Sequence, residues 1–183
     1  MSATRMEGNV FETALGLFAL CWTAKGIART YLPGLSEADL RTRLAERSVT
    51  LAPPSEAIGE LVSRITAYAS GERSDFSDVP LDLDGVPDFH RRAYAALLRI
   101  GWGETITYGA LARQLGDVTL SRAVGQAMGA NPVPLIVPCH RVLASDGKPG
   151  GFSAPGGAES KIRMLLLEGV TVGTPPGQYV FAF

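Results

Sequence analysis

The residues of this chain best suited to chemistry are Cys139, His140 and Arg141, which follow one another directly. A free cysteine has a pKa of about 8.5, so little of it is the nucleophilic thiolate at neutral pH. An imidazole and a guanidinium beside the thiol are groups that could lower this pKa. Neighbours on an extended chain point to opposite faces, so we expect a bridging water or a sharp turn to link Cys139 and His140. The alternative is a buried structural thiol.

The surrounding segment strengthens the chemical interpretation. Between residues 131 and 142 the chain reads Asn-Pro-Val-Pro-Leu-Ile-Val-Pro-Cys-His-Arg-Val. Its prolines remove backbone donors and favour extended geometry, so we expect no α-helix here, and the aliphatic run should carry the chain into the interior. This string resembles the active-site segment of the O6-alkylguanine-DNA alkyltransferases. The similarity extends from about residue 86 to residue 169.

The resemblance implies a single reaction, in which an alkyl group on guanine O6 moves to Cys139 and stays there. Cys139 would attack as the thiolate, His140 would act as its base through a water, and Glu168 would orient and stabilise the imidazole. Asn131 is implied to bond the turn that holds Cys139. Tyr108 is implied to rotate the phosphate of the target nucleotide and to donate a proton to guanine N3.

The resemblance also implies how the lesion is reached. A base inside a duplex cannot present O6 to a buried thiol, so the nucleotide must be extruded, at a cost of a few kcal/mol. Arg122 would enter the base stack and fill the vacated space, and the small residues Ala123 and Gly125 would let the helix approach the minor groove. Other residues implied to contact the DNA or the flipped base are Met128, Arg141, Val142 and Ser153. The backbone carbonyls near Cys139 and Val142 would accept from the guanine amino group, Ser153 would meet O6, and Met128 would pack against the base.

Each assignment has a plainer alternative. Glu168 could be a surface carboxylate at a helix end, Arg122 an ordinary phosphate contact, and Tyr108 a half-buried aromatic at a helix start. The chain also departs from the family pattern at Phe152, where a Tyr is common, and at Ala154, where a Gly is common. These differences, with a turn over 155–158 that looks longer than usual, leave the alkyl-size preference of the pocket open.

The elements that must position these residues can be predicted from helix signals. Helices are predicted over residues 87–100, 108–115, about 119–128 and 159–168. Thr107 is a good cap for the second, Gly116 ends it, and Thr119 or Ser121 opens the third. A short helix, a tight turn and a second helix with a small polar start predict a helix-turn-helix, although such pairs also occur in protein cores. The tail after Gly169 should be irregular.

The N-terminal half has a different pattern. Residues 9–33 predict strand, turn, strand, with helix as the alternative for the Ala-rich parts. A helix should begin at Ser36, a short strand should cover 49–51, and a second helix should run from Ser55 to Gly71. We therefore expect an α+β fold, with a small N-terminal α/β lobe over 1–84 and a mostly helical C-terminal lobe over 85–183 that carries the helix-turn-helix and Cys139. No chemistry is assigned to the N-terminal lobe.

Charge is distributed unevenly between these halves. The 183 residues carry a net charge of −1. Residues 1–84 hold 8 Lys/Arg against 12 Asp/Glu, and residues 85–183 hold 9 against 6. The half that carries the Cys-His-Arg string is therefore positive, which is compatible with DNA binding. The partner that the family resemblance implies is double-stranded DNA containing O6-alkylguanine, with O4-alkylthymine as a second candidate lesion.

Other partners are not indicated. Cys21 and Cys139 lie far apart and the chain has 2 His, so we expect no metal site of usual spacing, and no cofactor motif is present. A free reactive thiol fits a reducing cytosol, and neither a signal peptide nor a membrane span is predicted. We expect a cytoplasmic monomer. The functions left as alternatives are a non-catalytic lesion-binding protein, a Cys-His hydrolase, and a DNA-binding regulator that uses only the helix-turn-helix.

Overall fold

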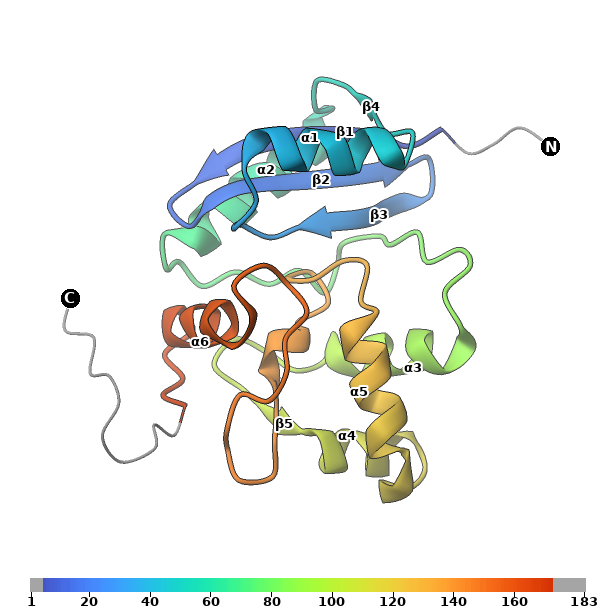
Figure 1. Ribbon diagram of the computed structural model, residues 1–183, viewed down its shortest axis with the longest axis vertical. Coiled ribbons are helices and arrows are strands. Elements are labelled where there is room, and N and C mark those ends of the chain that lie inside the picture. Colours follow the sequence, from blue (N-terminus) through green and yellow to red (C-terminus); the bar gives the residue numbers. More distant parts are fainter. Residues whose placement is uncertain (1–4, 173–183) are drawn as a thin grey trace.

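The computed structural model describes residues 5–172, which fold into two stacked lobes (Figure 1). The N-terminal lobe is built on a four-stranded sheet with the order β3-β2-β1-β4. Its strands are β1 (Glu7–Thr13), β2 (Gly16–Thr23), β3 (Gly26–Tyr31) and β4 (Thr50–Leu51). The first three are antiparallel neighbours, and β4 runs parallel to β1. The expected α+β class is confirmed.

The prediction for the start of the chain was wrong in one respect, because three strands form where two were expected. The missed turn lies at Ala14 and Leu15, where the Thr13 hydroxyl accepts from the Leu15 N–H at 3.1 Å and donates to the Gly16 carbonyl at 2.9 Å. Gly16 has a φ of 119°, which a side chain would strain. The turn lacks the Asn-Gly or Asp-Gly pair that usually marks such hairpins, so the sequence pattern did not show it.

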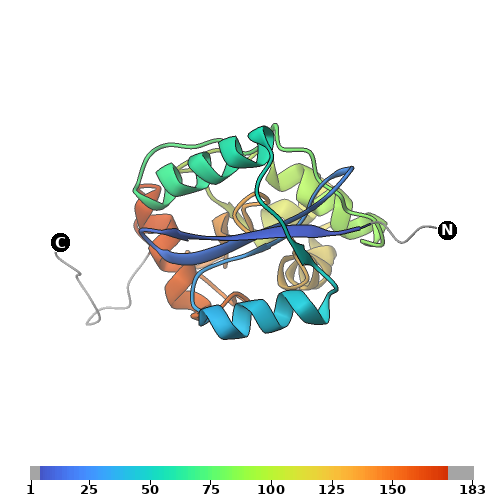
Figure 2. The same cartoon turned by 90° about the horizontal axis from the view of Figure 1, so that it is seen from above.

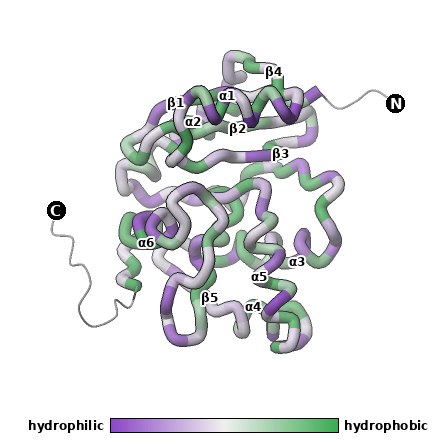
Figure 3. Tube along the Cα trace, in the orientation of Figure 1, coloured by the Kyte–Doolittle hydropathy of each residue, from purple (hydrophilic) through white to green (hydrophobic). Residues whose placement is uncertain are grey.

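The two helices of this lobe cover opposite faces of the sheet (Figure 2). They are α1 (Glu37–Glu46) and α2 (Glu56–Ala69), and both begin where predicted, at the N-caps Ser36 and Ser55. Hydrophilic and hydrophobic residues alternate along α1 (Figure 3), as expected of a helix with one buried face. Leu40 and Leu44 of that face pack in one cluster with Cys21. Both faces of this sheet are thus covered by a helix.

The C-terminal lobe is mostly helical, as expected. Its elements are α3 (Asp88–Leu97), β5 (Ile106–Thr107), α4 (Tyr108–Leu115), the 3-10 turn η1 (Val118–Leu120), α5 (Ser121–Gly129), the 3-10 turn η2 (Cys139–Arg141), β6 (Val142–Leu143) and α6 (Gly157–Leu167). The Thr107 hydroxyl caps α4 by accepting from the Ala110 N–H, as predicted. Helices α4 and α5, joined by η1, form the predicted helix-turn-helix. The expected irregular tail is described only as far as Val172; the remainder lies outside the described residues.

One hydrophobic core spans both lobes, with Phe18, Leu20 and Ile65 from the first and Leu97 and Val137 from the second in a single cluster. The edge of β3 also bonds directly to the C-terminal lobe. The Thr30 N–H donates to the Pro132 carbonyl at 3.0 Å, and the Thr30 hydroxyl donates to the Pro134 carbonyl at 2.6 Å. The proposed division at residues 84 and 85 therefore remains a prediction. Among the described residues, no helix is both long and apolar enough to cross a membrane.

Candidate active site

The segment that carries Cys139 is tightly turned. Cys139, His140 and Arg141 form one 3-10 turn and are not extended. The Arg141 N–H donates to the Pro138 carbonyl at 2.9 Å and closes the turn. A turn was one of the two ways in which the thiol and imidazole could be linked. In the described part of the chain, however, no direct hydrogen bond joins the two side chains.

Asn131 clamps the loop that leads into this turn. Its side-chain amide donates to the Val137 carbonyl at 2.9 Å, and its side-chain oxygen accepts from the Val133 N–H at 3.0 Å. Both contacts fix the backbone just before Cys139. Together with the bonds from Thr30 to the Pro132 and Pro134 carbonyls, they hold the loop from both of its sides.

A buried carboxylate lies behind the thiol. Glu168 Oε1 is 2.7 Å from His140 Nε2, and both side chains are fully buried. Arg141 donates to the same carboxylate, from Nε to Oε2 at 2.9 Å and from Nη2 to Oε1 at 3.0 Å. Burial alone would raise the pKa of Glu168, but hydrogen bonds from His140 and Arg141 lower it to about 2. Glu168 is therefore an ionised group of the interior and not a surface carboxylate.

Arg141 lies elsewhere than expected. It was expected to contact DNA, but its guanidinium is turned inward, where it binds Glu168 and the Ile100 carbonyl. Only 7% of the residue is exposed. The reason is electrostatic, since an ionised buried carboxylate requires a cation and hydrogen-bond donors nearby.

The protonation state of His140 follows from its surroundings. Burial lowers the pKa of His140, and this outweighs the opposing effect of Glu168. The imidazole is then neutral at neutral pH, and its Nε2–H donates to the carboxylate. Its other nitrogen, Nδ1, is buried and has no hydrogen-bond partner among residues 5–172. This nitrogen is free to accept a proton.

Cys139 is almost completely buried, with 4% of the residue exposed. Burial raises its pKa, while the Asn131 side chain and the positive charge of Lys161 oppose the rise. At rest the sulfur is therefore protonated, and a base must remove the proton when the thiol reacts.

Lys161 is a site residue that the sequence pattern did not reveal. It lies on α6, is fully buried, and donates from Nζ to the Val142 carbonyl at 2.5 Å. Its ammonium also lies 5.7 Å from the Tyr108 ring centre and 6.0 Å from that of Phe152. Burial lowers the pKa of Lys161 to about 8. A single lysine in an amphipathic helix is ordinarily exposed, so no local signal marks this position.

Tyr68 is the second residue that was missed, and it comes from the N-terminal lobe. Its hydroxyl donates to Glu168 Oε1 at 3.0 Å, from a fully buried ring on α2. A buried tyrosine hydroxyl generally needs a partner, but nothing in the sequence indicates that the partner lies 100 positions away.

A pocket of about 450 Å³ opens on the face of Cys139 that is turned toward the helix-turn-helix. The residues that line it are Tyr108, Gly125, Met128, Gly129, Cys139, Gly151, Phe152 and Ser153. Gly150 supports the Tyr108 side chain: it has a φ of 70°, and an added Cβ would come within 3.3 Å of the ring. The Ser153 hydroxyl donates to the Gly129 carbonyl at 3.1 Å. The thiol therefore forms part of the wall of a recess.

The predicted DNA-contacting residues of α5 lie at the surface near this pocket. Arg122 is exposed at the first turn of α5, and no hydrogen bond or ion pair within the described part of the chain involves its side chain. Ala123 is half-buried. A Cβ added to Gly125 would meet no atom within 4 Å, so this face of the helix is open. Among residues 5–172, no group of three potential metal-ligating side chains occurs.

Comparisons with known proteins agree with this geometry. Residues 88–170 match the family described as 6-O-methylguanine DNA methyltransferase, DNA binding domain. A methylated-DNA–protein-cysteine methyltransferase of Mycobacterium tuberculosis is 46% identical over 116 residues, covering 63% of this chain and 68% of that protein. A DNA base-flipping protein of Thermus thermophilus is 43% identical over 118 residues, covering 62% of this chain and 78% of that protein.

The likeness extends to the whole architecture. The crystal structure of Mycobacterium tuberculosis OGT in complex with DNA superimposes with a TM-score of 0.72 and 34% sequence identity. The match covers 89% of this chain and 93% of the other, so it includes the N-terminal lobe. The chain therefore belongs to the family of methylated-DNA–protein-cysteine methyltransferases.

Proposed function

We propose that this protein repairs DNA by moving an alkyl group from guanine O6 in a duplex to the sulfur of Cys139. The observation that supports this most is the buried pair of Glu168 and His140, 2.7 Å apart, in which His140 shares a 3-10 turn with Cys139, a residue that lines a recess. A structural cysteine requires neither a buried ionised carboxylate nor a neutral imidazole beside it. Membership of the family supports the same reaction.

The proton of the thiol would leave through His140. Nε2–H is held by Glu168, so Nδ1 is the basic nitrogen, and a water bound there would bridge to Cys139. As the thiolate forms its bond to the alkyl carbon, the bond from that carbon to O6 breaks and its electron pair returns to the guanine. The imidazolium that forms is stabilised by the Glu168 charge.

The departing guanine must also take up a proton. Tyr108, whose ring lines the same pocket, would donate to guanine N3 as the base leaves. Ser153 would meet O6, and the Val142 carbonyl would accept from the guanine amino group. The Val142 carbonyl already accepts from Lys161, and since a carbonyl has two lone pairs it can receive both donors.

Access to the base requires extrusion of the nucleotide. Arg122 is exposed beside an open helix face formed by Ala123 and Gly125, and it would fill the gap in the base stack. Met128, at the wall of the pocket, would pack against the flipped base.

The reaction should occur once per molecule, because a thioether does not hydrolyse at neutral pH and no reductant is supplied. Intact-mass analysis after incubation with excess duplex O6-methylguanine should show one added methyl group, located on Cys139. Cys139→Ala should bind the same duplex without gaining mass. Repeated turnover would contradict the acceptor role.

The second candidate is a lesion-binding protein without transfer activity. The similarity to the Thermus thermophilus DNA base-flipping protein favours it. The same experiment separates the two functions, because a pure binder would retain the duplex but gain no mass. Presence of the thiol beside His140 and Glu168 makes transfer the preferred proposal.

A further inference from the structure

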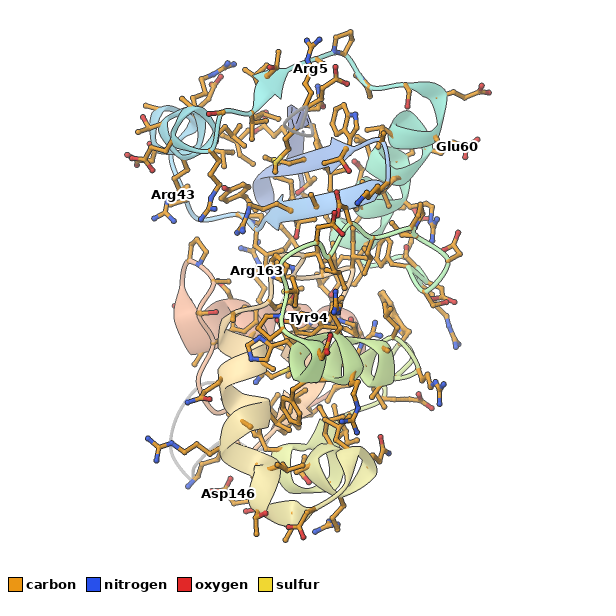
Figure 4. All side chains as sticks on the ribbon, turned by 90° about the vertical axis from the view of Figure 1, so that its right-hand side faces the viewer. Arg5, Arg43, Glu60, Tyr94, Asp146 and Arg163 are labelled. Atoms are coloured by element: carbon orange, nitrogen blue, oxygen red, sulfur yellow. The ribbon has the colours of Figure 1, made fainter. Side chains whose placement is uncertain are left out.

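A second cavity, of about 200 Å³, reaches Cys139 from the side of the N-terminal lobe. On that lobe it is lined by Arg29 and Tyr31 of β3 and by Arg43 of α1, and on the other by Pro134 and Ser153 among others. In Figure 4 the labelled Arg43 extends from α1 toward the C-terminal lobe. The cavity is thus a cleft between the lobes, and Cys139 forms part of its wall.

The charged residues that line this cleft are all positive. Its lining includes the two arginines and no Asp, Glu, Lys or His. Within residues 5–172, neither guanidinium takes part in a hydrogen bond or an ion pair. Other arginines of the same lobe are neutralised: Arg41 pairs with Glu37 and Arg64 with Asp78. Two unpaired guanidinium groups in a recess make a site for an anion.

The position of the cleft indicates which anion it would meet. The cleft and the 450 Å³ pocket share Met128, Gly129, Cys139, Phe152 and Ser153, so Cys139 borders both spaces. A guanine that entered past Tyr108 and α5 would occupy the larger pocket. Atoms of its O6 substituent beyond the reacting carbon would then lie toward the cleft, which Arg29 and Arg43 line.

We propose that the protein accepts O6-alkyl groups that end in a carboxylate, and that Arg29 and Arg43 bind this carboxylate. The inference rests on the proposed alkyl transfer. The thiolate bonds to the carbon next to O6, the bond from that carbon to O6 breaks with its electron pair going to the guanine, and the carboxylate remains attached to the carbon now on sulfur. Charge attraction favours the acidic substituent before, during and after transfer.

The test compares two free bases that differ only in charge, O6-(4-carboxybenzyl)guanine and its neutral carboxamide analogue. Rates of adduct formation on Cys139 are measured by intact mass with the full chain. The carboxylate should react roughly threefold to tenfold faster, the scale of a partly solvated ion pair. This ratio should fall as salt is added, because the cleft is open to solvent.

Variants assign the effect to residues. In Arg43→Met, and more fully in the Arg29→Met/Arg43→Met double variant, the ratio of carboxylate to carboxamide rates should approach one. Because both rates are measured on the same variant, a change in folding or in thiol reactivity affects them equally and cancels in the ratio of carboxylate to carboxamide rates. Arg41→Met, on the same helix but outside the cleft, should keep the wild-type ratio.

Other results would contradict either this inference or the proposed function. A wild-type ratio near one, or a ratio that the arginine variants leave unchanged, overturns the inference while leaving alkyl transfer intact. If the variants instead slow every duplex substrate equally and leave the free-base ratio unchanged, the arginines bind DNA phosphate and the inference is again overturned. If neither free base nor methylated duplex alkylates Cys139, the proposed function itself fails.

Discussion

At the scale of single residues, the buried carboxylate of Glu168 receives hydrogen bonds from three side chains. Oε1 faces His140, Arg141 and Tyr68, and Oε2 accepts from Arg141. These donors keep the carboxylate ionised in a buried position. The ionised carboxylate in turn fixes the imidazole with Nε2–H toward it and Nδ1 toward the other side. The geometry of the proposed base is therefore set by one carboxylate.

Glu168→Gln should therefore slow transfer strongly. The amide would present N–H groups or a weaker acceptor to His140 and would no longer stabilise an imidazolium, so we expect a loss of roughly 100-fold. Without this base the thiol must ionise unaided, and since burial raises the pKa of Cys139, the pH midpoint of the rate should move upward. Single-turnover rates across the neutral and alkaline range measure both effects. An unchanged rate and profile would remove Glu168 from the mechanism.

Lys161 is a second charged residue that influences the Cys139 thiol. Its positive charge favours the thiolate, so Lys161→Met should raise the pKa of Cys139. The pKa of Lys161 is itself lowered to about 8, so its charge is present below that pH and lost above it. The difference between wild type and variant should therefore be largest below pH 8 and fade above it.

Iodoacetamide labelling of Cys139, followed by peptide mass analysis against pH, measures this shift. Cys21 should stay unmodified and serve as an internal reference, because burial raises its pKa to about 12. Lys148→Met is the matched control, since Lys148 is exposed and paired with Asp146. An equal shift in both lysine variants would indicate a general charge effect.

At the scale of elements, local signals predicted the helices well. Ser36, Ser55 and Thr107 cap the helices that they were expected to cap, because a capping bond spans three residues and is visible in the sequence. The Cys139 turn could not be predicted in the same way. Its conformation is stabilised by Arg141 reaching Glu168 and Ile100, contacts made far along the chain, and these override the extended preference of the prolines.

Arg122 on helix α5 is proposed to support extrusion of the target nucleotide, the step that brings the base to the thiol. Substitution of Arg122 tests this role. Arg122→Ala should slow repair of duplex O6-methylguanine by one or more orders of magnitude, at about 1.4 kcal/mol per tenfold, because nothing then offsets unstacking. Free O6-benzylguanine needs no extrusion and should react almost as before. Arg122→Lys should recover only part, since an ammonium cannot stack as a planar guanidinium does. Equal losses on both substrates would assign Arg122 to the fold.

At the scale of the whole molecule, the N-terminal lobe takes part in the site. Thr30 holds the loop before Cys139, Tyr68 bonds Glu168, and Arg29 and Arg43 line the cleft. None of this was predicted, and the chemistry was assigned to the C-terminal half alone. The reason is that each contact joins residues far apart in sequence, about which a cap, a spacing or a periodicity carries no information.

Tyr68→Phe tests this participation with a minimal change. Loss of one hydrogen bond to an ionised group should lower stability by about 1.5–3 kcal/mol. It should also slow alkyl transfer severalfold and shift the pH–rate profile upward, because Glu168 is then held less firmly against His140. The measurements are urea unfolding and single-turnover rates against pH.

Tyr94→Phe is the matched control for this prediction. Tyr94 is also a fully buried tyrosine, but its hydroxyl donates to the Ala127 carbonyl at 2.8 Å and does not reach Glu168. This variant should lose stability and keep the wild-type pH–rate profile. If Tyr68→Phe loses only stability as well, then α2 supports the fold without influencing the carboxylate, and the chemistry belongs to the C-terminal lobe alone. A profile shifted only in Tyr68→Phe would mean that the relay is completed across the junction of the two lobes.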